Sequence, residues 1–268
     1  MSGRRRPTRQ RRADLSQHYL RDPVAQRLVH ATSITSADLV IEIGPGRGAL
    51  THPLTRCAGR VIGVEADAYH ADKLQRRFGD KARFVTGDFL NYALPNEPYL
   101  CLGNVPYAIT TDIIRKLHTA PVPPLDAWLV VQRELAYRFC GPPFTNESLW
   151  SLRLKPFWHL EIVDRLQRTD FDPPPSVESV YMHFARRTRP LITPEQADAY
   201  ARLLTRAFAQ NQSISQALRS MLSKRQIHRL ATDFCFSPQH RPSELMFEQW
   251  LAIFRFVHAQ AQARRDTP

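Results

Sequence analysis

Short apolar segments rich in β-branched residues alternate with segments of helical length over the first two thirds of the chain, and this alternation constrains the fold most. The expected strands lie at residues 39–43, 61–65, 83–86, 99–103 and 128–132. Stretches such as residues 68–78 and 110–118 lie between them and have the length of crossover helices. Strands joined by such helices pair in parallel, so the pattern predicts an α/β fold with helices on both faces of the sheet.

The last third of the sequence predicts two further structures. Residues 160–166 and 180–184 flank a proline-rich turn and predict an antiparallel hairpin at one edge of the sheet. After Pro190 the apolar residues recur at helical spacing, and Thr193 followed by Pro194 is a good helix start. We therefore expect a small C-terminal all-helical domain.

These patterns divide the chain into four expected segments. The catalytic domain is expected at residues 13–187 and the helical domain at residues 190–263. Residues 1–12 and residues 264–268 are expected to be disordered tails, since they contain few apolar residues.

The charge of the chain points to a polyanionic partner. Lys and Arg number 37 against 25 Asp and Glu, which gives a net charge of +12. Six of the first twelve residues are arginines, and residues 199–232 contain six Lys or Arg and no acid. Such clustering is costly by self-repulsion unless a partner such as phosphate neutralises it; the alternative is a role in solubility. A membrane partner is not expected, because the basic N-terminus lacks an apolar face and no apolar run has the length of a membrane span.

A glycine-rich loop follows the first expected strand, in the sequence Glu42-Ile-Gly44-Pro-Gly46-Arg-Gly48. Glycines let the backbone turn sharply and approach a ligand closely. The spacing differs from the dinucleotide fingerprint G-x-G-x-x-G, so a nicotinamide-dependent oxidoreductase is the weaker interpretation. The form Glu-x-Gly-x-Gly-x-Gly resembles motif I of S-adenosylmethionine-dependent methyltransferases.

Acidic residues end the second and third expected strands. Glu65 is placed to accept hydrogen bonds from ribose hydroxyls, and Asp88 can accept one from an adenine amino group. The backbone of Phe89 or Leu90 would face the edge of the adenine ring. The carboxyl ends of parallel strands are where such folds bind nucleosides, so these residues predict a nucleoside site.

The fourth expected strand ends in Asn104-Val105-Pro106-Tyr107. The amino nitrogen of an aromatic base is planar because its lone pair is delocalised into the ring. Acceptors at both N–H groups favour a more nucleophilic nitrogen, and the Asn104 side-chain oxygen and the Val105 carbonyl would be those acceptors. Pro106 would stiffen the turn and Tyr107 would stack on the base.

The sequence from Asn104 to Leu117 resembles the Erm family of rRNA adenine-N6 methyltransferases, whose broader relatives are the small-subunit rRNA dimethyladenosine transferases. Residues 16–20 resemble the family's N-terminal Gln-Asn-Phe-Leu element, and residues 171–177 its late Phe-x-Pro-x-Pro-x-Val loop. The resemblance covers residues 15–184 closely. It implies a Rossmann-like methyltransferase sheet, an RNA-binding helical domain and S-adenosylmethionine as cofactor.

The resemblance also implies roles for individual residues. Gln17, His18 and Leu20 would lie along the methionine and ribose end of the cofactor, and Gly44 and Gly46 would pass under the methionine. Glu65 would hold the ribose and Asp88 the cofactor adenine, with Phe89 beside it. Asn104 would contact cofactor and target, and Tyr107 with Phe171 would sandwich the flipped adenine. His18 stands where asparagine is usual, and Val105 where isoleucine or leucine is usual.

The sequence therefore predicts a monomeric, cytoplasmic methyltransferase acting on N6 of an adenine in 23S rRNA, which would confer resistance to macrolide, lincosamide and streptogramin B antibiotics. No metal is expected, because a sulfonium already activates the methyl group. Two alternatives remain: a 16S rRNA dimethyladenosine transferase, and a non-catalytic RNA-binding relative.

Overall fold

The computed structural model describes residues 18–210 and 212–265. The first part of the chain forms a seven-stranded sheet. The strands are β1 (Tyr19–Leu20), β2 (Leu39–Ile43), β3 (Arg60–Glu65), β4 (Arg83–Thr86), β5 (Leu100–Asn104), β6 (Asp126–Gln132), β7 (Trp158–Leu166), β8 (Phe171–Asp172) and β9 (Ser179–Arg186). The α-helices are α2 (Asp22–His30), α3 (Thr51–Cys57), α4 (Ala68–Phe78), α5 (Thr110–His118), α6 (Arg133–Cys140), α7 (Leu149–Leu154), α8 (Pro194–Phe208), α9 (Ile214–Leu218), α10 (Lys224–Asp233) and α11 (Phe247–Arg265).

The strand order in the sheet is β4-β3-β2-β5-β6-β9-β7. β2 pairs in parallel with both β3 and β5, and β4 and β6 extend the parallel part outward. The predicted Rossmann-like sheet is thus confirmed, with each central strand within two residues of its expected bounds. The chain first moves from β2 toward β4 and then returns to the other side of β2, so the strand order reverses between β2 and β5.

One edge of the sheet is antiparallel, as predicted. β9 runs antiparallel to β6, and β7 lies beside β9 at the edge. A second, two-stranded sheet was not predicted: β1 pairs antiparallel with β8, with Tyr19 opposite Asp172 and Leu20 opposite Phe171. Strands of two residues have no periodicity of their own, which explains why the sequence pattern did not indicate them.

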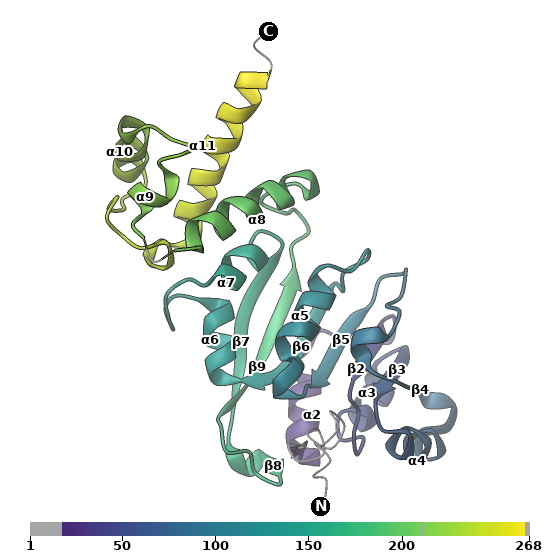
Figure 1. Ribbon diagram of the computed structural model, residues 1–268. Helices are drawn as coiled ribbons and strands as arrows, with labels where there is room; N and C mark the ends of the chain where they lie inside the picture. Colours follow the sequence, from purple (N-terminus) through teal and green to yellow (C-terminus); the bar gives the residue numbers. More distant parts are fainter. Residues whose placement is uncertain (1–17, 211, 266–268) are drawn as a thin grey trace, which may run out of the picture. The chain divides into compact units, whose positions relative to one another are not determined.

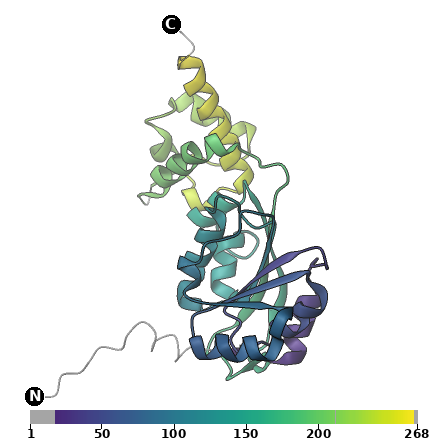
Figure 2. The same cartoon turned by 90° about the vertical axis from the view of Figure 1, so that its right-hand side faces the viewer.

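Helices cover both faces of the large sheet (Figures 1 and 2). The apolar faces of α2, α3 and α4 pack in one core with side chains from the central strands; its fully buried residues include Leu28, Val40, Leu54 and Leu102. α5 buries Ile113, Ile114 and Leu117. The buried strands are apolar on both faces, which is the pattern of a sheet covered by crossover helices.

The chain divides into two compact units. Among the described residues, the first comprises residues 18–136 and 161–186, and the second residues 137–160, 187–210 and 212–265. The sequence analysis assigned all of residues 13–187 to one domain, whereas the structure groups residues 137–160 with the helical unit. The physical reason is packing, since Leu152 of α7 is fully buried in the same apolar core as Leu204 of α8 and Trp250 of α11.

The helical unit confirms the expected all-helical C-terminal region, with one difference at its end. α11 continues to Arg265, so residues 264 and 265 are helical where a disordered tail was expected. The expected tail at residues 1–12 lies outside the described residues. Across the described part of the chain, every helix is too short or too polar to cross a membrane.

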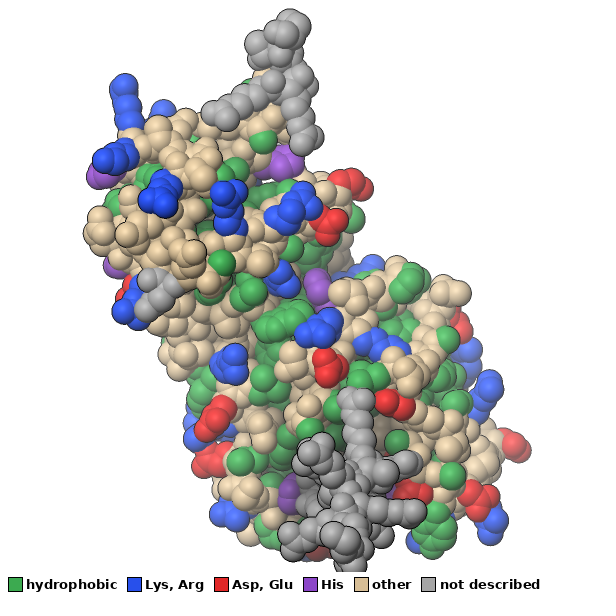
Figure 3. All heavy atoms as spheres, in the orientation of Figure 1, with side chains coloured by type: hydrophobic (Ala, Val, Ile, Leu, Met, Phe, Trp, Pro, Cys, Tyr) green, Lys and Arg blue, Asp and Glu red, His purple; other side chains and the backbone are tan. Residues whose placement is uncertain are grey.

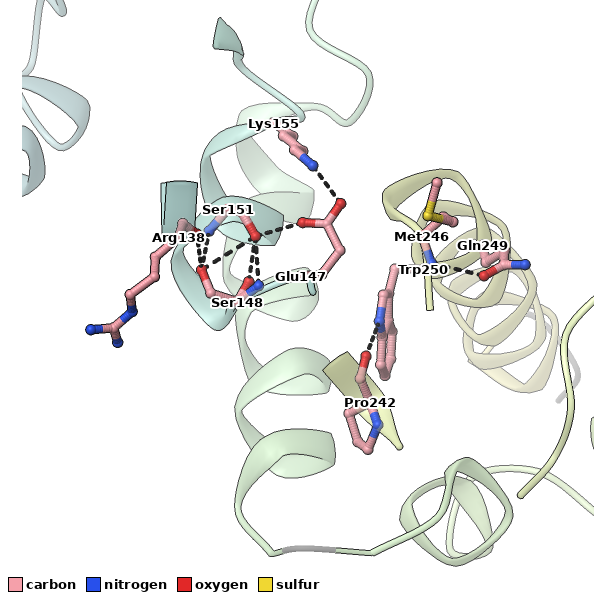
Figure 4. Close-up of polar contacts among 9 residues, drawn as sticks. All are labelled: Arg138, Glu147, Ser148, Ser151, Lys155, Pro242, Met246, Gln249 and Trp250. Carbon is pink, nitrogen blue, oxygen red and sulfur yellow. Dashed lines mark hydrogen bonds and ion pairs between the residues drawn. The ribbon is translucent and has the colours of Figure 1, made fainter. Parts of the chain in front are cut away.

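A buried polar cluster lies inside the helical unit (Figure 4). The Glu147 side chain is 2% exposed and forms an ion pair with Lys155, whose side chain is 17% exposed. Ser151 Oγ donates to Glu147 Oε2 at 2.6 Å, and Ser151 also forms a capping box with Ser148 at the start of α7. Gly141, at φ +70°, leaves the space that the Glu147 carboxylate occupies, because a Cβ there would lie 2.6 Å from Oε2.

A second buried carboxyl group lies on β2. Glu42 is 1% exposed, and its Oε2 accepts a 2.6 Å hydrogen bond from Thr51 Oγ1. Its Oε1 has no hydrogen-bond partner among the described residues. Burial, with a further contribution from the charge of Glu65, raises the pKa of Glu42 to about 8, even though the Thr51 hydrogen bond lowers it. Glu42 is therefore largely protonated in the folded protein at neutral pH.

Replacing Glu147 with glutamine should destabilise the protein by on the order of 3 kcal/mol, because the largely buried Lys155 ammonium loses its counter-charge while the Ser151 hydrogen bond can persist. Urea-induced unfolding measures the change. The control is Asp233→Asn in the same unit, which removes the exposed ion pair with Arg229 and should cost about 0.5 kcal/mol or less. Equal effects of the two substitutions would contradict the assignment.

The Glu42→Gln variant should become more stable than the wild type as the pH rises. Between pH 4.5, the ordinary pKa, and about 8, the folded wild type holds a proton that the unfolded chain has lost. The contribution of Glu42 to the stability of the wild type is therefore complete below pH 4.5. It is lost as the pH rises toward 8, at up to about 1.4 kcal/mol per pH unit. Unfolding in urea near pH 5 and near pH 8 measures it; a difference between variant and wild type that does not change with pH would disprove the buried neutral acid.

Candidate active site at the carboxyl ends of the parallel strands

An open cleft lies at the carboxyl ends of β2, β3, β4 and β5, where the strand order reverses. It encloses about 1100 Å³, including solvent at its mouth. Open α/β sheets bind ligands at this position, because the loops that leave the two central strands diverge to opposite faces and leave a crevice. The cleft is lined by residues from each of these strand ends and by His18, Tyr19 and Leu20.

The glycine loop after β2 forms the floor of the cleft. Gly44 and Gly46 have φ of +63° and +56°, a left-handed conformation that other residues adopt only with strain. A Cβ on Gly46 would lie 2.9 Å from the Tyr19 ring, so only glycine allows this ring to pack on the loop. The loop backbone that lines the cleft can therefore lie directly against a ligand.

Glu65 fixes this loop from the end of β3. Its Oε2 accepts a 2.8 Å hydrogen bond from the Gly46 N–H, and its Oε1 accepts a 3.0 Å bond from the Asp67 N–H. The Glu65 residue is buried, with 6% exposure, yet it lines the cleft. Each carboxylate oxygen can accept a second hydrogen bond, so Glu65 can also receive hydroxyl donors from a ligand.

The loop after β4 forms one wall. Asp88 is exposed, lines the cleft and caps the short 3-10 helix Phe89–Asn91 by accepting from the Leu90 N–H at 2.9 Å. Lys116 of α5 secures this loop, since its ammonium donates to the carbonyls of Phe89 at 2.7 Å, Leu90 at 3.0 Å and also Tyr92. The sequence analysis did not identify Lys116, because nothing in its local pattern connects it with a loop 24 or more residues away.

The loop after β5 forms the opposite wall. Asn104 Nδ2 donates to the His18 carbonyl at 2.6 Å, which leaves Oδ1 as the side-chain acceptor. The Tyr107 hydroxyl bonds to Ser179 Oγ at 2.6 Å, which holds the ring in position at the cleft. Ser179 begins β9, 72 residues further along the chain, so no local sequence signal could have identified it.

The N-terminal strand β1 closes one side of the cleft. Arg47 of the glycine loop lies over the Tyr19 ring, with 4.2 Å between the guanidinium carbon and the ring centroid, and forms a 3.2 Å ion pair with Asp172 of β8. His18 Nδ1 lies 2.9 Å from the Pro173 carbonyl. These contacts join the segment before α2 to the proline-rich loop, which the sequence analysis treated as separate elements.

Most of the predicted site residues meet in this one cleft. They are His18, Leu20, Gly44, Gly46, Glu65, Asp88, Phe89, Asn104, Val105, Pro106 and Tyr107. Two do not: Gln17 lies outside the described residues, and Phe171 is a correction. Its ring is fully buried in the apolar core of the sheet unit and is absent from the cleft lining, because β8 pairs with β1 and turns the side chain inward.

The cleft fits a nucleoside that carries an amino-acid chain, as S-adenosylmethionine does. The glycine loop gives a backbone surface without side chains, Glu65 offers carboxylate acceptors for ribose hydroxyls, and Asp88 offers one for an adenine amino group. The chemistry of these donors and acceptors therefore agrees with the predicted cofactor.

Comparison with known proteins shows the family to which the chain belongs. The family model "Ribosomal RNA adenine dimethylase" matches residues 8–258. The chain is 33% identical over 260 residues to ribosomal RNA small subunit methyltransferase A of Synechococcus sp. (strain JA-3-3Ab), covering 90% of this chain and 91% of that protein. It is 29% identical over 252 residues to the mycinamicin-resistance protein MyrB of Micromonospora griseorubida, covering 91% and 78% of the two chains.

A solved structure agrees in fold and in extent. The crystal structure of the 23S rRNA methyltransferase ErmE superposes with a TM-score of 0.82 at 27% identity, over 90% of this chain and 99% of that chain. Because the family model covers both the cleft and most of the helical unit, the chain belongs to the ribosomal RNA adenine dimethylase family and is an S-adenosylmethionine-dependent rRNA adenine-N6 methyltransferase.

Proposed function

We propose that the chain methylates N6 of one adenine in the peptidyl-transferase region of 23S rRNA and thereby confers resistance to macrolide, lincosamide and streptogramin B antibiotics. The observation that carries the catalytic part is the Asn104 amide, which is held by the His18 carbonyl beside Tyr107 in the cleft. An oriented acceptor beside an aromatic ring is what the amino group of a base requires.

The target adenine leaves its RNA stack and stacks on Tyr107, since a base inside a helix does not expose its amino group to an enzyme. Asn104 Oδ1 and the Val105 carbonyl accept its two N–H groups and orient the nitrogen lone pair. As the nitrogen attacks, it becomes more positive, and these two oxygens stabilise that charge. Their orientation is fixed before the reaction, so little reorganisation is needed.

The bound cofactor supplies an electrophilic methyl group on a sulfonium. In-line displacement depends mainly on the relative position of the methyl donor and the attacking nitrogen. The strand ends on the two sides of the cleft fix that position. Glu65, Gly46 and Asp88 hold the methyl donor on the side of β2 to β4, and Asn104 holds the acceptor nitrogen on the side of β5. The proton leaves the nitrogen after methyl transfer, when the nitrogen is most acidic, so no strong base is required.

The helical unit provides a surface for rRNA phosphates. Arg202, Arg206, Arg219, Lys224 and Arg225 are all exposed. Lys and Arg side chains spread across the face of this unit drawn in Figure 3. Phosphate contacts of this kind give affinity without reading sequence, so the choice of adenine depends on RNA shape and on the cleft.

Two features support 23S rRNA as the substrate. The Thr-Thr-Asp-Ile-Ile-Arg-Lys run at residues 110–116 resembles Erm proteins. The superposition on the 23S rRNA methyltransferase ErmE extends over nearly all of that chain. The second candidate is an adenine of 16S rRNA, which the identity with the Synechococcus small-subunit methyltransferase over nine tenths of its length favours.

The Asn104→Ala variant should lower the rate of methyl transfer by about 10²–10³-fold, by analogy with the loss of a positioned donor in an oxyanion hole. RNA affinity should hardly change, because most RNA contacts are to phosphates. Single-turnover methyl transfer to a 23S rRNA fragment at saturating S-adenosylmethionine measures the rate.

The matched control is Ser179→Ala, which removes the hydrogen bond of the Tyr107 hydroxyl and leaves its ring. Its rate should stay within about tenfold of the wild type, since one neutral hydrogen bond contributes about 1 kcal/mol. If Asn104→Ala instead weakens RNA binding and leaves the rate intact, the acceptor role is wrong.

Primer extension on rRNA should locate the modified base. In a host without its own 16S adenine dimethylation, expression of the wild type should produce a reverse-transcription stop at one adenine of the 23S peptidyl-transferase region, because N6-dimethyladenine cannot form its normal base pair. Cells whose 23S rRNA gives this stop should also grow in the presence of a macrolide. The Asn104→Ala variant is the control and should give neither. A stop confined to 16S rRNA would replace the 23S assignment with the second candidate.

A further inference from the structure

The short 3-10 helix that follows β4 is held by a side chain at each of its ends. At its start, the Asp88 carboxylate accepts from the Leu90 N–H at 2.9 Å. At its end, the Lys116 ammonium donates to three carbonyls, those of Phe89 at 2.7 Å, Leu90 at 3.0 Å and Tyr92. The last carbonyls of a helix have few partners within it, so Lys116 supplies bonds that the loop itself cannot make.

The three carbonyls match the donor capacity of the ammonium. A lysine ammonium has three N–H donors and no acceptor, so these bonds occupy all of its donors. The ammonium also lies 5.2 Å from the centroid of the Phe89 ring. Lys116 therefore acts on a ligand only through the loop that it holds, as a positioning residue.

The position of the ammonium is set by α5. Ile113, Ile114 and Leu117 of this helix are buried, which fixes the helix around Lys116. The pKa of Lys116 is lowered because the side chain is partly buried, and the nearby charge of Asp88 opposes this shift. A helix anchored in the packed part of the sheet unit thus holds a surface loop in place.

The loop carries an acceptor that can distinguish one purine from another. Asp88 is exposed in the cleft lining, and the bond from the Leu90 N–H to Oδ1 leaves Oδ2 as the second acceptor. A purine with an amino group at C6 donates a hydrogen bond to such an oxygen. A purine with an oxygen at C6 meets it with a second acceptor and is repelled. The direction of one carboxylate therefore separates the two bases.

We propose that Lys116 determines the selectivity of the cofactor site for a 6-aminopurine, because it fixes the loop from which Asp88 reaches the base. The inference rests on the proposed contact between Asp88 and the cofactor adenine. Without the three carbonyl bonds, the 3-10 helix loses the support of its end and the carboxylate loses its fixed direction. Binding of the ribose and amino-acid parts depends on Glu65 and the glycine loop, so it changes less.

A pair of ligands that differ only at C6 of the base measures this selectivity. Calorimetry with the full chain compares S-adenosylhomocysteine with S-inosylhomocysteine, which carries an oxygen in place of the amino group. The wild type should bind the adenosyl compound about 10–100-fold more tightly, the contribution of one hydrogen bond to a charged group. Lys116→Met keeps the length of the side chain without its donors and should lower this preference about tenfold. A wild-type preference in Lys116→Met overturns the proposal.

The matched control is Arg115→Met on the same helix. Arg115 is exposed and forms an ion pair with Asp112, so this substitution removes the same charge without touching the loop. Its preference for the adenosyl compound should equal that of the wild type. An equal loss in both variants would assign the effect to the charge of α5 and overturn the proposal. Lys116→Gln keeps an amide donor and should give an intermediate preference, so it provides the test if Lys116→Met does not fold.

Hydrogen exchange provides a readout without any ligand. In Lys116→Met, the backbone amides of residues 88–92 should exchange about tenfold or more faster than in the wild type, because the loop opens more often. Peptides from α5 and from the helical unit should exchange as in the wild type, which also shows that the variant is folded. Unchanged exchange at residues 88–92 overturns the proposal.

Asp88→Ala separates this inference from the proposed function. If Asp88→Ala keeps the preference for the adenosyl compound, Asp88 does not contact the base and the proposed cofactor contact is wrong. If Asp88→Ala loses the preference and Lys116→Met keeps it, only the role of Lys116 is refuted. In the double variant, Lys116→Met should cause no further loss of preference, since both residues act through one carboxylate. Additive losses overturn the proposal.

Discussion

The reversal of strand order between β2 and β5 is the constraint on which the site depends. It opens a crevice between two strands that are themselves paired, so the sheet remains continuous beneath the cleft. Residues from four strand ends, separated by up to about sixty positions in the sequence, then line one cleft. In the proposed function the two sides of the crevice have separate tasks: β2 to β4 would face the methyl donor, and β5 would face the base that receives the methyl group.

Backbone conformation and buried carboxyl groups work together around the glycine loop. Glu65 accepts from the Gly46 N–H and so holds the loop in its left-handed conformation. Glu42 lies beneath it, largely neutral, and bonds to Thr51 at the start of α3. A second charged carboxylate so near Glu65 would be repelled, and the raised pKa of Glu42 avoids that repulsion near neutral pH.

The short β1–β8 sheet lies at one side of the cleft, which His18, Tyr19 and Leu20 line. Through it, the segment before α2 meets the proline-rich loop, and His18 contacts both Asn104 and Pro173. The same pairing turns Phe171 into the core. The Phe171 ring is therefore absent from the cleft lining, whereas the His18 ring lies 6.3 Å from the Tyr107 ring, centroid to centroid.

The sequence by itself determined the parallel sheet, the glycine loop, the acids at the strand ends and the Asn104 to Tyr107 turn, because each is a local pattern: strand periodicity, glycine spacing, or a polar residue directly after a strand. The tertiary structure alone decided the partners that lie far apart in the chain. Lys116 on the Phe89 loop, Ser179 on Tyr107, His18 opposite Tyr107 and Phe171 in the core all follow from how the chain packs. Contacts across 27 to 155 residues leave no periodic trace in the sequence, since each depends on the three-dimensional course of the chain between the two partners.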